Sequence, residues 1–466
     1  MKTHFLSLRH TFGRYATAFS LLLLILLFDS CSKDKATNPV MLKKGLNYSS
    51  NLSVIAGKNI IMQGFYWNVP SGGTWWTVLQ GKVSAWASAG ITAVWLPPSC
   101  KCQSGALSVG YDPFDYFDFG NYNQMGTTKT LYGSKTDLTT LIGDAHTAGL
   151  KVYADIVINH CAGGSSQANP NTGTNTNTSF LPASGMFNRG YNDFHPSTYE
   201  TSDEGVFKSY PDLCHANPYD AGWCYANSNS IAQTYKAMGY DGWRFDYVAG
   251  YHPWVVQNWL TAVGGFAVGE FWDSSVTNVQ NWITAEGSTA SAFDFPCYYA
   301  LQEAFVNDDL TALSTYGMLC KSNPSHAVTF VANHDIDNIY TNKLSAYAFI
   351  LAHEGTPCIF YSDYEQWLSK DKLNNLIWIN KNLAAGTTTV LYADSDEYVA
   401  KMSGSPGLVI YINNLGSTLS RSITTNWQSK TIKDYTGNVT GSLTTSSSKT
   451  VTISAPANSY SIWSTE

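Results

Sequence analysis

The sequence predicts an α/β fold, a (β/α)8 (TIM) barrel with a long loop domain inserted after strand 3 and a C-terminal antiparallel β domain. Three observations support this prediction. Short apolar or β-branched runs alternate with helix-like segments from Asn59 to about Tyr361. Between residues 161 and 226 the alternation lapses into a stretch rich in Gly, Asn, Thr, Ser and Asp. After about Leu383, alternating runs and Ser/Thr-rich turns indicate antiparallel strands.

Eight runs are expected to form the barrel strands. In chain order they are Ile60–Phe65, Ala93–Leu96, Val152–Ile156, Gly242–Asp246, Phe266–Glu270, Ala292–Phe295, Val328–Val331 and Cys358–Phe360. Helix-like stretches lie between them, for example Leu138–Ala148 and Pro253–Val263. Strands that alternate with helices over about 250 residues or more are typical of this barrel.

The inserted stretch follows the third strand, so it is expected at the C-terminal face of the barrel, where barrel enzymes build their sites. A loop of this length is expected to be functional or a small domain. The predicted order is a lipoprotein-type signal peptide, a linker, the barrel in two parts, the inserted domain B and a β-sandwich-like domain C. Their ranges are 1–30, 31–57, 58–160 with 227–383, 161–226 and 384–466.

The N-terminus is typical of a signal peptide. Its positive region contains Lys2, Arg9 and Arg14. An apolar stretch, Ala16–Phe28, follows, and it is too short to span a bilayer permanently. Cys31 then resembles the lipidated first residue of a bacterial lipoprotein. We therefore expect export and anchoring to the outer or cytoplasmic membrane at Cys31. Ordinary signal cleavage and secretion stay open, because Asp29 is unusual in such a signal.

The composition indicates a globular protein that does not bind nucleic acid. The formal net charge is −7 and only 13% of residues are charged, so the basic stripe that nucleic acid requires is missing. Aromatic residues make up 14% of the chain. This suits a carbohydrate partner, although aromatic side chains also fill cores and interfaces. Eight cysteines remain after Cys31, and the sequence leaves their pairing open. We expect a monomer.

Polar groups follow several of the expected strands. In Arg244-Phe245-Asp246 the strand period of two places Arg244 and Asp246 on one face. An Arg beside a carboxylate keeps it ionised, as a covalent nucleophile must be, although a buried structural ion pair would look the same. Glu270 follows the next strand, and a carboxyl in a partly apolar pocket beside another carboxylate could serve as a general acid.

Each of these motifs taken alone also fits a structural role, but together they predict glycoside hydrolysis. This reaction needs two carboxyl groups, about 5–5.5 Å apart when the anomeric configuration is retained. Neighbouring barrel strands can supply that spacing. Two further segments, DIVINH from Asp155 to His160 and FVANHD from Phe330 to Asp335, end other expected strands.

The four segments DIVINH, GWRFDYV, VGEFWD and FVANHD, in this order, resemble the four signature regions of the α-amylase family of glycoside hydrolases, family 13. The stretches IIMQGFYW from Ile60, GYDPFDYFD from Gly110 and AYAFIL from Ala346 resemble the archaeal- and plant-type branch, the archaeal type most closely. The resemblance covers roughly residues 58–466.

This resemblance implies roles for individual residues. Asp246 would be the nucleophile, Glu270 the general acid and base, and Asp335 the stabiliser of the distorted transition state. Arg244 would orient Asp246, and Asp155 would be structural. The substrate contacts implied in the subsite before the scissile bond are His160, His334 and Tyr111. The branch pattern has Lys three residues after the nucleophile, where this chain has Ala249, which puts its product pattern in doubt.

The resemblance also implies calcium between the barrel and the inserted loop. The matching ligands are Asn159, Asp203, Gly205, Asp212 and Gly250. An all-oxygen set suits this hard cation, although Asp203 and Asp212 could be ordinary loop carboxylates. Some archaeal members hold zinc with two His and one Cys. Here His195 and Cys214 match but the third position is Glu200, so zinc is not expected.

The expected function is that of an endo-acting, retaining α-1,4-glucan hydrolase that degrades starch to maltooligosaccharides. One alternative is a related enzyme with maltogenic or transglycosylating preference, because specificity lies in loops. Another is a non-catalytic surface glycan-binding lipoprotein. The presence of Asp246, Glu270 and Asp335 argues against that second alternative.

Overall fold

The structure is a computed structural model that describes residues 59–202 and 209–466. Eight parallel strands close into a barrel in the order β1-β12-β11-β10-β9-β8-β5-β2. Their bounds are β1 Ile61–Gln63, β2 Ala93–Trp95, β5 Lys151–Ile156, β8 Gly242–Phe245, β9 Phe266–Gly269, β10 Ser291–Phe293, β11 Ala327–Phe330 and β12 Thr356–Phe360. The predicted strands and barrel are confirmed, although several strands are shorter than expected. Asp246 and Glu270 each lie one residue beyond the end of a strand.

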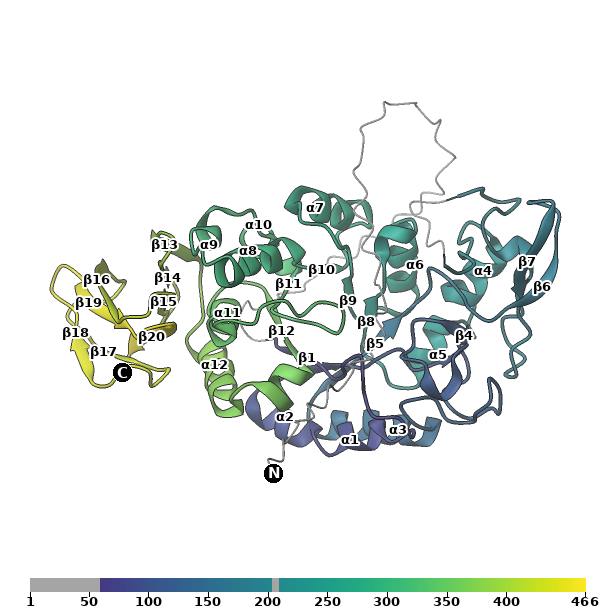
Figure 1. The fold of residues 1–466 in the computed structure, drawn as a ribbon, viewed down its shortest axis with the longest axis horizontal. Helices are drawn as coiled ribbons and strands as arrows, with labels where there is room; N and C mark the ends of the chain where they lie inside the picture. The colour runs from purple at the N-terminus through teal and green to yellow at the C-terminus, as the bar shows by residue number, and fades with distance from the viewer. Residues whose placement is uncertain (1–58, 203–208) are drawn as a thin grey trace, which may run out of the picture. The chain divides into compact units, whose positions relative to one another are not determined.

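Helices alternate with the strands and surround them (Figure 1). They are α1 Trp75–Gln80, α2 Val83–Ala89, α3 Lys135–Thr147, α5 Ile231–Ala237, α6 Trp254–Val263, α7 Val276–Ala285, α8 Phe295–Val306, α9 Ala312–Thr315, α10 Leu319–Ser322, α11 Lys343–Leu351 and α12 Lys370–Asn382. The predicted helical stretches correspond to α3 and α6. Every helix in the described ranges is too short or too polar to span a bilayer.

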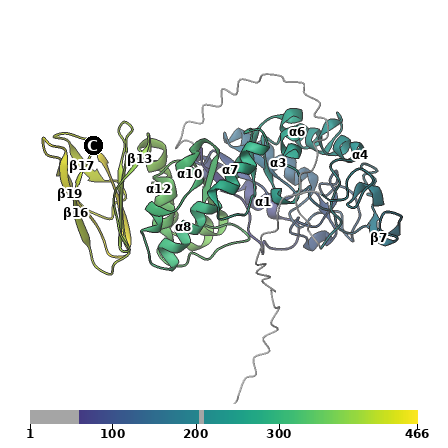
Figure 2. The same ribbon diagram turned by 90° about the horizontal axis from the view of Figure 1, so that it is seen from above.

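Local capping explains where two of these helices begin. Ser134 accepts a hydrogen bond from the backbone N–H of Asp137, whose carboxylate accepts one from the Ser134 N–H, forming a capping box at α3. Asp294 caps α8 through the N–H of Cys297 and also accepts from the N–H of Cys320 in α10. This carboxylate therefore ties α10 to α8, and the two helices lie side by side (Figures 1 and 2).

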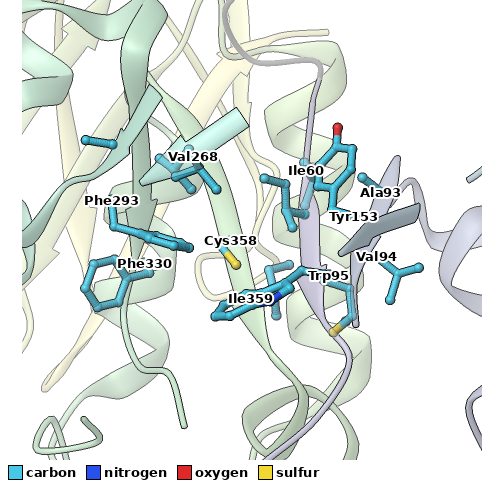
Figure 3. Packing of buried hydrophobic residues seen from close by; sticks show 14 of the residues in the cluster. Ile60, Ala93, Val94, Trp95, Tyr153, Val268, Phe293, Phe330, Cys358 and Ile359 are labelled. Carbon is cyan, nitrogen blue, oxygen red and sulfur yellow. The ribbon is translucent and has the colours of Figure 1, made fainter. Parts of the chain in front are cut away.

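The barrel interior is filled by side chains. Trp95 of β2 and Phe293 of β10 meet across the barrel with ring centroids 5.5 Å apart, and Phe293 packs edge-to-face on Phe330 of β11 at 5.7 Å (Figure 3). Because β2 and β10 are not neighbours in the sheet, this contact passes through the centre of the barrel. A filled interior leaves the site to the C-terminal ends of the strands.

Two insertions follow early barrel strands. The antiparallel pair β3 Lys101–Cys102 and β4 Pro113–Asp115 follows β2 and was not predicted. After β5 come the antiparallel pair β6 Ser165–Asn169 and β7 Thr174–Ser179, then the short helix α4 Pro218–Ala221. This second insertion lies within residues 161–226, the range expected for domain B.

The C-terminal residues form antiparallel sheets. One sheet has the order β13-β14-β15-β20-β17-β18, and β16 pairs with β19 in a second sheet. The bounds are β13 Thr388–Ala393, β14 Glu397–Met402, β15 Val409–Asn413, β16 Leu419–Thr424, β17 Thr431–Asp434, β18 Ser442–Thr444, β19 Thr450–Ala455 and β20 Ser459–Thr465. Apolar side chains of both sheets, including Val409 and Ile453, share one core, as in a sandwich.

All eight cysteines of the described residues carry free thiols and are buried.

Candidate active site

Arg244 lies at the centre of the site and contacts three carboxylates. Its Nη1 donates to Oδ1 of Asp155 at 2.9 Å and to Oδ1 of Asp246 at 2.7 Å. Its Nη2 lies 2.8 Å from Oε1 of Glu270. These residues come from the adjacent strands β5, β8 and β9 or the positions just after them. One guanidinium group, only 1% exposed, therefore holds the predicted nucleophile and the predicted acid side by side.

The Asp155 carboxylate is enclosed by donors. Besides Arg244, the indole Nε1 of Trp95 donates to its Oδ2 at 3.0 Å and the hydroxyl of Tyr111 does so at 2.9 Å. Asp155 is buried, and no side of its carboxylate is left for a substrate. This geometry fits the structural role that the resemblance implies.

Glu270 has a carboxyl suited to donate a proton near neutral pH. Burial raises the pKa of Glu270 to about 8, and the charges of Asp246 and Asp335 add to this while Arg244 opposes it. The Tyr247 N–H lies 3.2 Å from Oε2 of Glu270 and donates to it. Tyr247 adopts the left-handed region, with φ of 44°, directly after Asp246, a strained conformation of the kind found at functional sites.

Asp335 and His334 follow β11 on the opposite side of the barrel mouth. Nε2 of His334 lies 3.2 Å from Oδ2 of Asp335, and Nδ1 of His334 lies 3.0 Å from the amide nitrogen of Gln63. Burial raises the pKa of Asp335 to about 6, with Arg244 opposing the rise. Burial and the charge of Arg244 lower the pKa of His334 well below its usual value, so its ring is neutral.

Stacked rings adjoin these groups. The Tyr111 ring lies parallel to His334, with centroids 5.2 Å apart, and to Trp67, with centroids 6.0 Å apart. His160 lies close by, because its Nε2 is 3.0 Å from the carbonyl oxygen of Tyr111. Trp67 is 45% exposed, so a sugar ring could reach its face.

The structure brings together three of the five predicted calcium ligands. Oδ1 of Asn159 is buried and makes no hydrogen bond to a described residue. A Cβ added at Gly250 would collide with this oxygen, so the Gly250 backbone lies directly against it. The Leu213 N–H donates to the Asn159 carbonyl at 2.8 Å, which places Asp212 beside Asn159. Asp203 and Gly205 lie outside the described residues.

A second group of ligand-type residues lies next to these oxygens. The ligand atoms of His195, Glu200 and Cys214 all lie within 4.8 Å of one another. His195 also lies 3.2 Å from Asp212 through Nδ1, and His252 lies 2.9 Å from Oε1 of Glu200 through Nε2. The three positions named for zinc are thus adjacent in space. Their carboxylate is engaged by His252, a contact that the sequence did not indicate.

Several site residues were missed in the sequence. Gln63, Trp67 and Trp95 all belong to β1, β2 or the turn after β1, and each contacts a predicted site residue. Their positions at the C-terminal ends of the first two strands could have indicated them. The signature regions directed attention to other strands instead.

Comparison with known proteins agrees with this geometry. A family model described as the alpha amylase catalytic domain matches residues 76–255, and one for the alpha-amylase C-terminal domain matches residues 408–464. An α-amylase of Geobacillus stearothermophilus is 29% identical, over 86% of each chain. A glucan 1,4-alpha-maltohexaosidase of Bacillus sp. (strain 707) is 29% identical, over 65% of this chain and 70% of its own.

Solved structures show the same fold. The acarbose-complexed α-amylase of Geobacillus thermoleovorans superposes with a TM-score of 0.67 at 18% identity, over 88% of this chain and 98% of its own. Placement in the archaeal- and plant-type branch stays a prediction. The motifs, the barrel with its C-terminal β domain and the two family matches together show that the chain belongs to the α-amylase family of glycoside hydrolases.

Proposed function

We propose that the chain is an endo-acting, retaining α-1,4-glucan hydrolase, an α-amylase that degrades starch-like polysaccharides to maltooligosaccharides. The observation that carries this proposal is the Arg244 guanidinium, which holds Asp246 and Glu270 side by side at the mouth of the barrel. Retention requires two carboxyl groups close together, one protonated and one able to attack. The pKa of about 8 makes Glu270 the protonated member at neutral pH.

The reaction proceeds in two displacements. In the first, Glu270 gives its proton to the glycosidic oxygen, an Asp246 oxygen bonds to the anomeric carbon, and the bond to the leaving chain breaks. In the second, the Glu270 carboxylate takes a proton from water, the water oxygen bonds to the anomeric carbon, and the bond to Asp246 breaks. Asp335 and His334 supply an acceptor and a donor for the sugar hydroxyls, and Trp67 and Tyr111 supply ring surfaces.

A starch assay of the purified mature protein beside Glu270→Gln tests the proposal. Rapid loss of iodine staining, with α-configured maltooligosaccharides as products, is expected for the wild type and should be abolished in the variant. Predominant release of one short product, or of transfer products, would instead favour the maltogenic or transglycosylating alternative. The similarity to a maltohexaosidase keeps that alternative open. Binding of starch without release of sugar would contradict the proposal that the chain is an enzyme.

We also propose that calcium is held by Asn159, Asp212 and the Gly250 carbonyl, together with Asp203 and Gly205. The buried Oδ1 of Asn159 supports this, because it has no hydrogen bond to a described residue and lies directly against the Gly250 backbone. A bound cation would tie β5 and the turn after β8 to the inserted loop. Metal analysis of the purified protein, before and after dialysis against a chelator, tests the assignment and also reports any zinc at His195, Glu200 and Cys214.

Export and lipid anchoring at Cys31 are a further proposal, and this residue lies outside the described part of the chain. The apolar stretch followed by Cys31 supports it. Expression of the full chain with a labelled fatty acid, beside Cys31→Ala, should label the wild type alone. Equal labelling, or none, would contradict the anchor.

A further inference from the structure

We propose that Gln63 is a positioning residue that holds His334 as a neutral imidazole with its proton on Nε2, the nitrogen on the side of Asp335, where it is available to the substrate. This inference rests on the proposed function for its purpose. Its geometry stands independently, because it concerns which nitrogen of a buried ring carries the proton.

Gln63 is fully buried on β1, with 0% of its surface exposed. Its amide nitrogen lies 3.0 Å from Nδ1 of His334, and its Oε1 makes no hydrogen bond to a described residue. A buried amide that makes a single side-chain hydrogen bond costs free energy compared with an apolar residue. An apolar residue at this position would give a more stable fold. We therefore assign Gln63 a function through its hydrogen bond to His334.

The position of the proton follows from the partners of the two ring nitrogens. A neutral imidazole has one N–H. Nε2 lies 3.2 Å from Oδ2 of Asp335 without the geometry of a hydrogen bond to a described residue, so a bare lone pair on Nε2 would face an anionic oxygen when Asp335 is ionised. The proton therefore belongs on Nε2. Nδ1 is then an acceptor, which requires the NH2 group of Gln63 as its donor. Turning the amide by half a rotation would place Oε1 against a ring nitrogen without a proton.

The surroundings of His334 favour the neutral ring. The charged groups that face it are Arg244 and Asp335. The rings around it are those of Phe65, Trp67, Trp95 and Tyr111. Burial and the charge of Arg244 lower the pKa of His334, and the nearby Asp335 carboxylate favours the N–H on the Nε2 side of the ring. Tyr111, parallel to the ring at 5.2 Å, limits its rotation.

This arrangement has a catalytic consequence. A neutral Nε2–H can donate to a sugar hydroxyl without adding a second cation beside Arg244. A second cation would favour the ionised form of nearby carboxyls and lower the pKa of Glu270, the proton donor. Gln63 thus keeps His334 uncharged, and this helps Glu270 to stay protonated. Gln63 itself is buried and acts only through His334.

Nitrogen NMR of protein labelled with 15N-histidine tests the proposal without any assay of activity. The His334 signals are assigned by their loss in His334→Asn. The wild type should show the Nε2–H tautomer from pH 7 to 8, where Asp335 is ionised. In Gln63→Glu, the carboxylate should draw a proton onto Nδ1, so that His334 becomes charged within this range. In Gln63→Leu, loss of the donor should mix the tautomers and lower kcat/KM by about 10-fold, the effect of one buried hydrogen bond.

Thr329→Val is the matched control. Thr329 is also a buried polar residue of a barrel strand, with a hydroxyl that makes no hydrogen bond to a described residue, and it is absent from the contacts of His334. It should leave the His334 signals unchanged. A wild type with the Nδ1–H tautomer, or a Gln63→Leu protein with unchanged tautomer, pH profile and kcat/KM, would overturn the proposal. If the protein shows the expected tautomer but does not hydrolyse starch, the proposed function is wrong and the assignment of the proton still holds.

Discussion

Glu270 should destabilise the folded protein above neutral pH, and Glu270→Gln should relieve this. Burial raises the pKa of Glu270 from 4.5 to about 8. A carboxyl with a higher pKa in the folded protein than in the unfolded chain binds a proton on folding. Its stabilising contribution is therefore fully present at a pH below the pKa of the unfolded chain, 4.5, and is lost as the pH rises through the folded pKa of about 8. At about 1.4 kcal/mol per pKa unit, the loss is at most about 5 kcal/mol.

The assay is urea unfolding of the wild type and Glu270→Gln at pH 5, 7 and 9. The glutamine is isosteric and its oxygen can still accept from Arg244, so the variant should unfold with nearly the wild-type free energy at pH 5. It should be the more stable protein by several kcal/mol at pH 9. Glu303→Gln is the control, because the Glu303 carboxylate accepts from Asn307 on the exposed side of α8, remote from the site. A difference between wild type and Glu270→Gln that does not grow with pH would refute the reasoning.

Three further outcomes follow from the site. The wild-type kcat/KM on soluble starch should fall as the pH rises above about 8, because Glu270 must be protonated to act. A pH–rate profile without this fall would indicate that another group is the acid. Arg244→Lys should lower kcat/KM by at least about 100-fold, because an ammonium group cannot span three carboxylates; steady-state kinetics near the wild-type value would contradict this. A chelator should lower the Tm of the wild type and leave that of Asn159→Ala unchanged, as followed by calorimetry, and equal shifts in both would argue against calcium at this oxygen.

The sequence was sufficient to predict the barrel because its strands are short, apolar and separated by helices. All eight expected runs overlap an observed strand. The ends of the strands were less accurate. β8 ends at Phe245 rather than Asp246, because the chain turns into the left-handed conformation at Tyr247. Side-chain periodicity carries no information on such a turn. The pair β3 and β4 was missed because each strand has only two or three residues.

The candidate site could be predicted only where a motif carried it. Arg244, Asp246 and Glu270 lie in two signature regions that end neighbouring strands, so their proximity follows from the order of the strands. Gln63 and His334 are 271 positions apart, and they meet only because the barrel closes by pairing β1 with β12, next to β11. Local pattern cannot reveal contacts that depend on closure. The bond between His252 and Glu200 was missed because it joins the inserted loop to the segment after β8, 52 positions away, and no local pattern indicates that contact.

The hydrogen-bond geometry of the site explains which carboxyl holds the proton. The carboxyls of Asp155, Asp246, Glu270 and Asp335 all interact with the single guanidinium of Arg244, and a buried group with more anions than cations takes up protons. Asp155 receives Trp95 and Tyr111 as additional donors. Among the described residues, the second oxygen of Glu270 receives only the backbone N–H of Tyr247, at 3.2 Å, so fewer donors stabilise the ionised form of Glu270 than that of Asp155. The pKa of Glu270 accordingly rises to about 8, against about 7 for Asp155 and about 6 for the half-exposed Asp335. Tyr111→Phe, which keeps the ring surface but removes this hydroxyl donor from Asp155, should therefore shift the proton from Glu270 towards Asp155 and impair the acid.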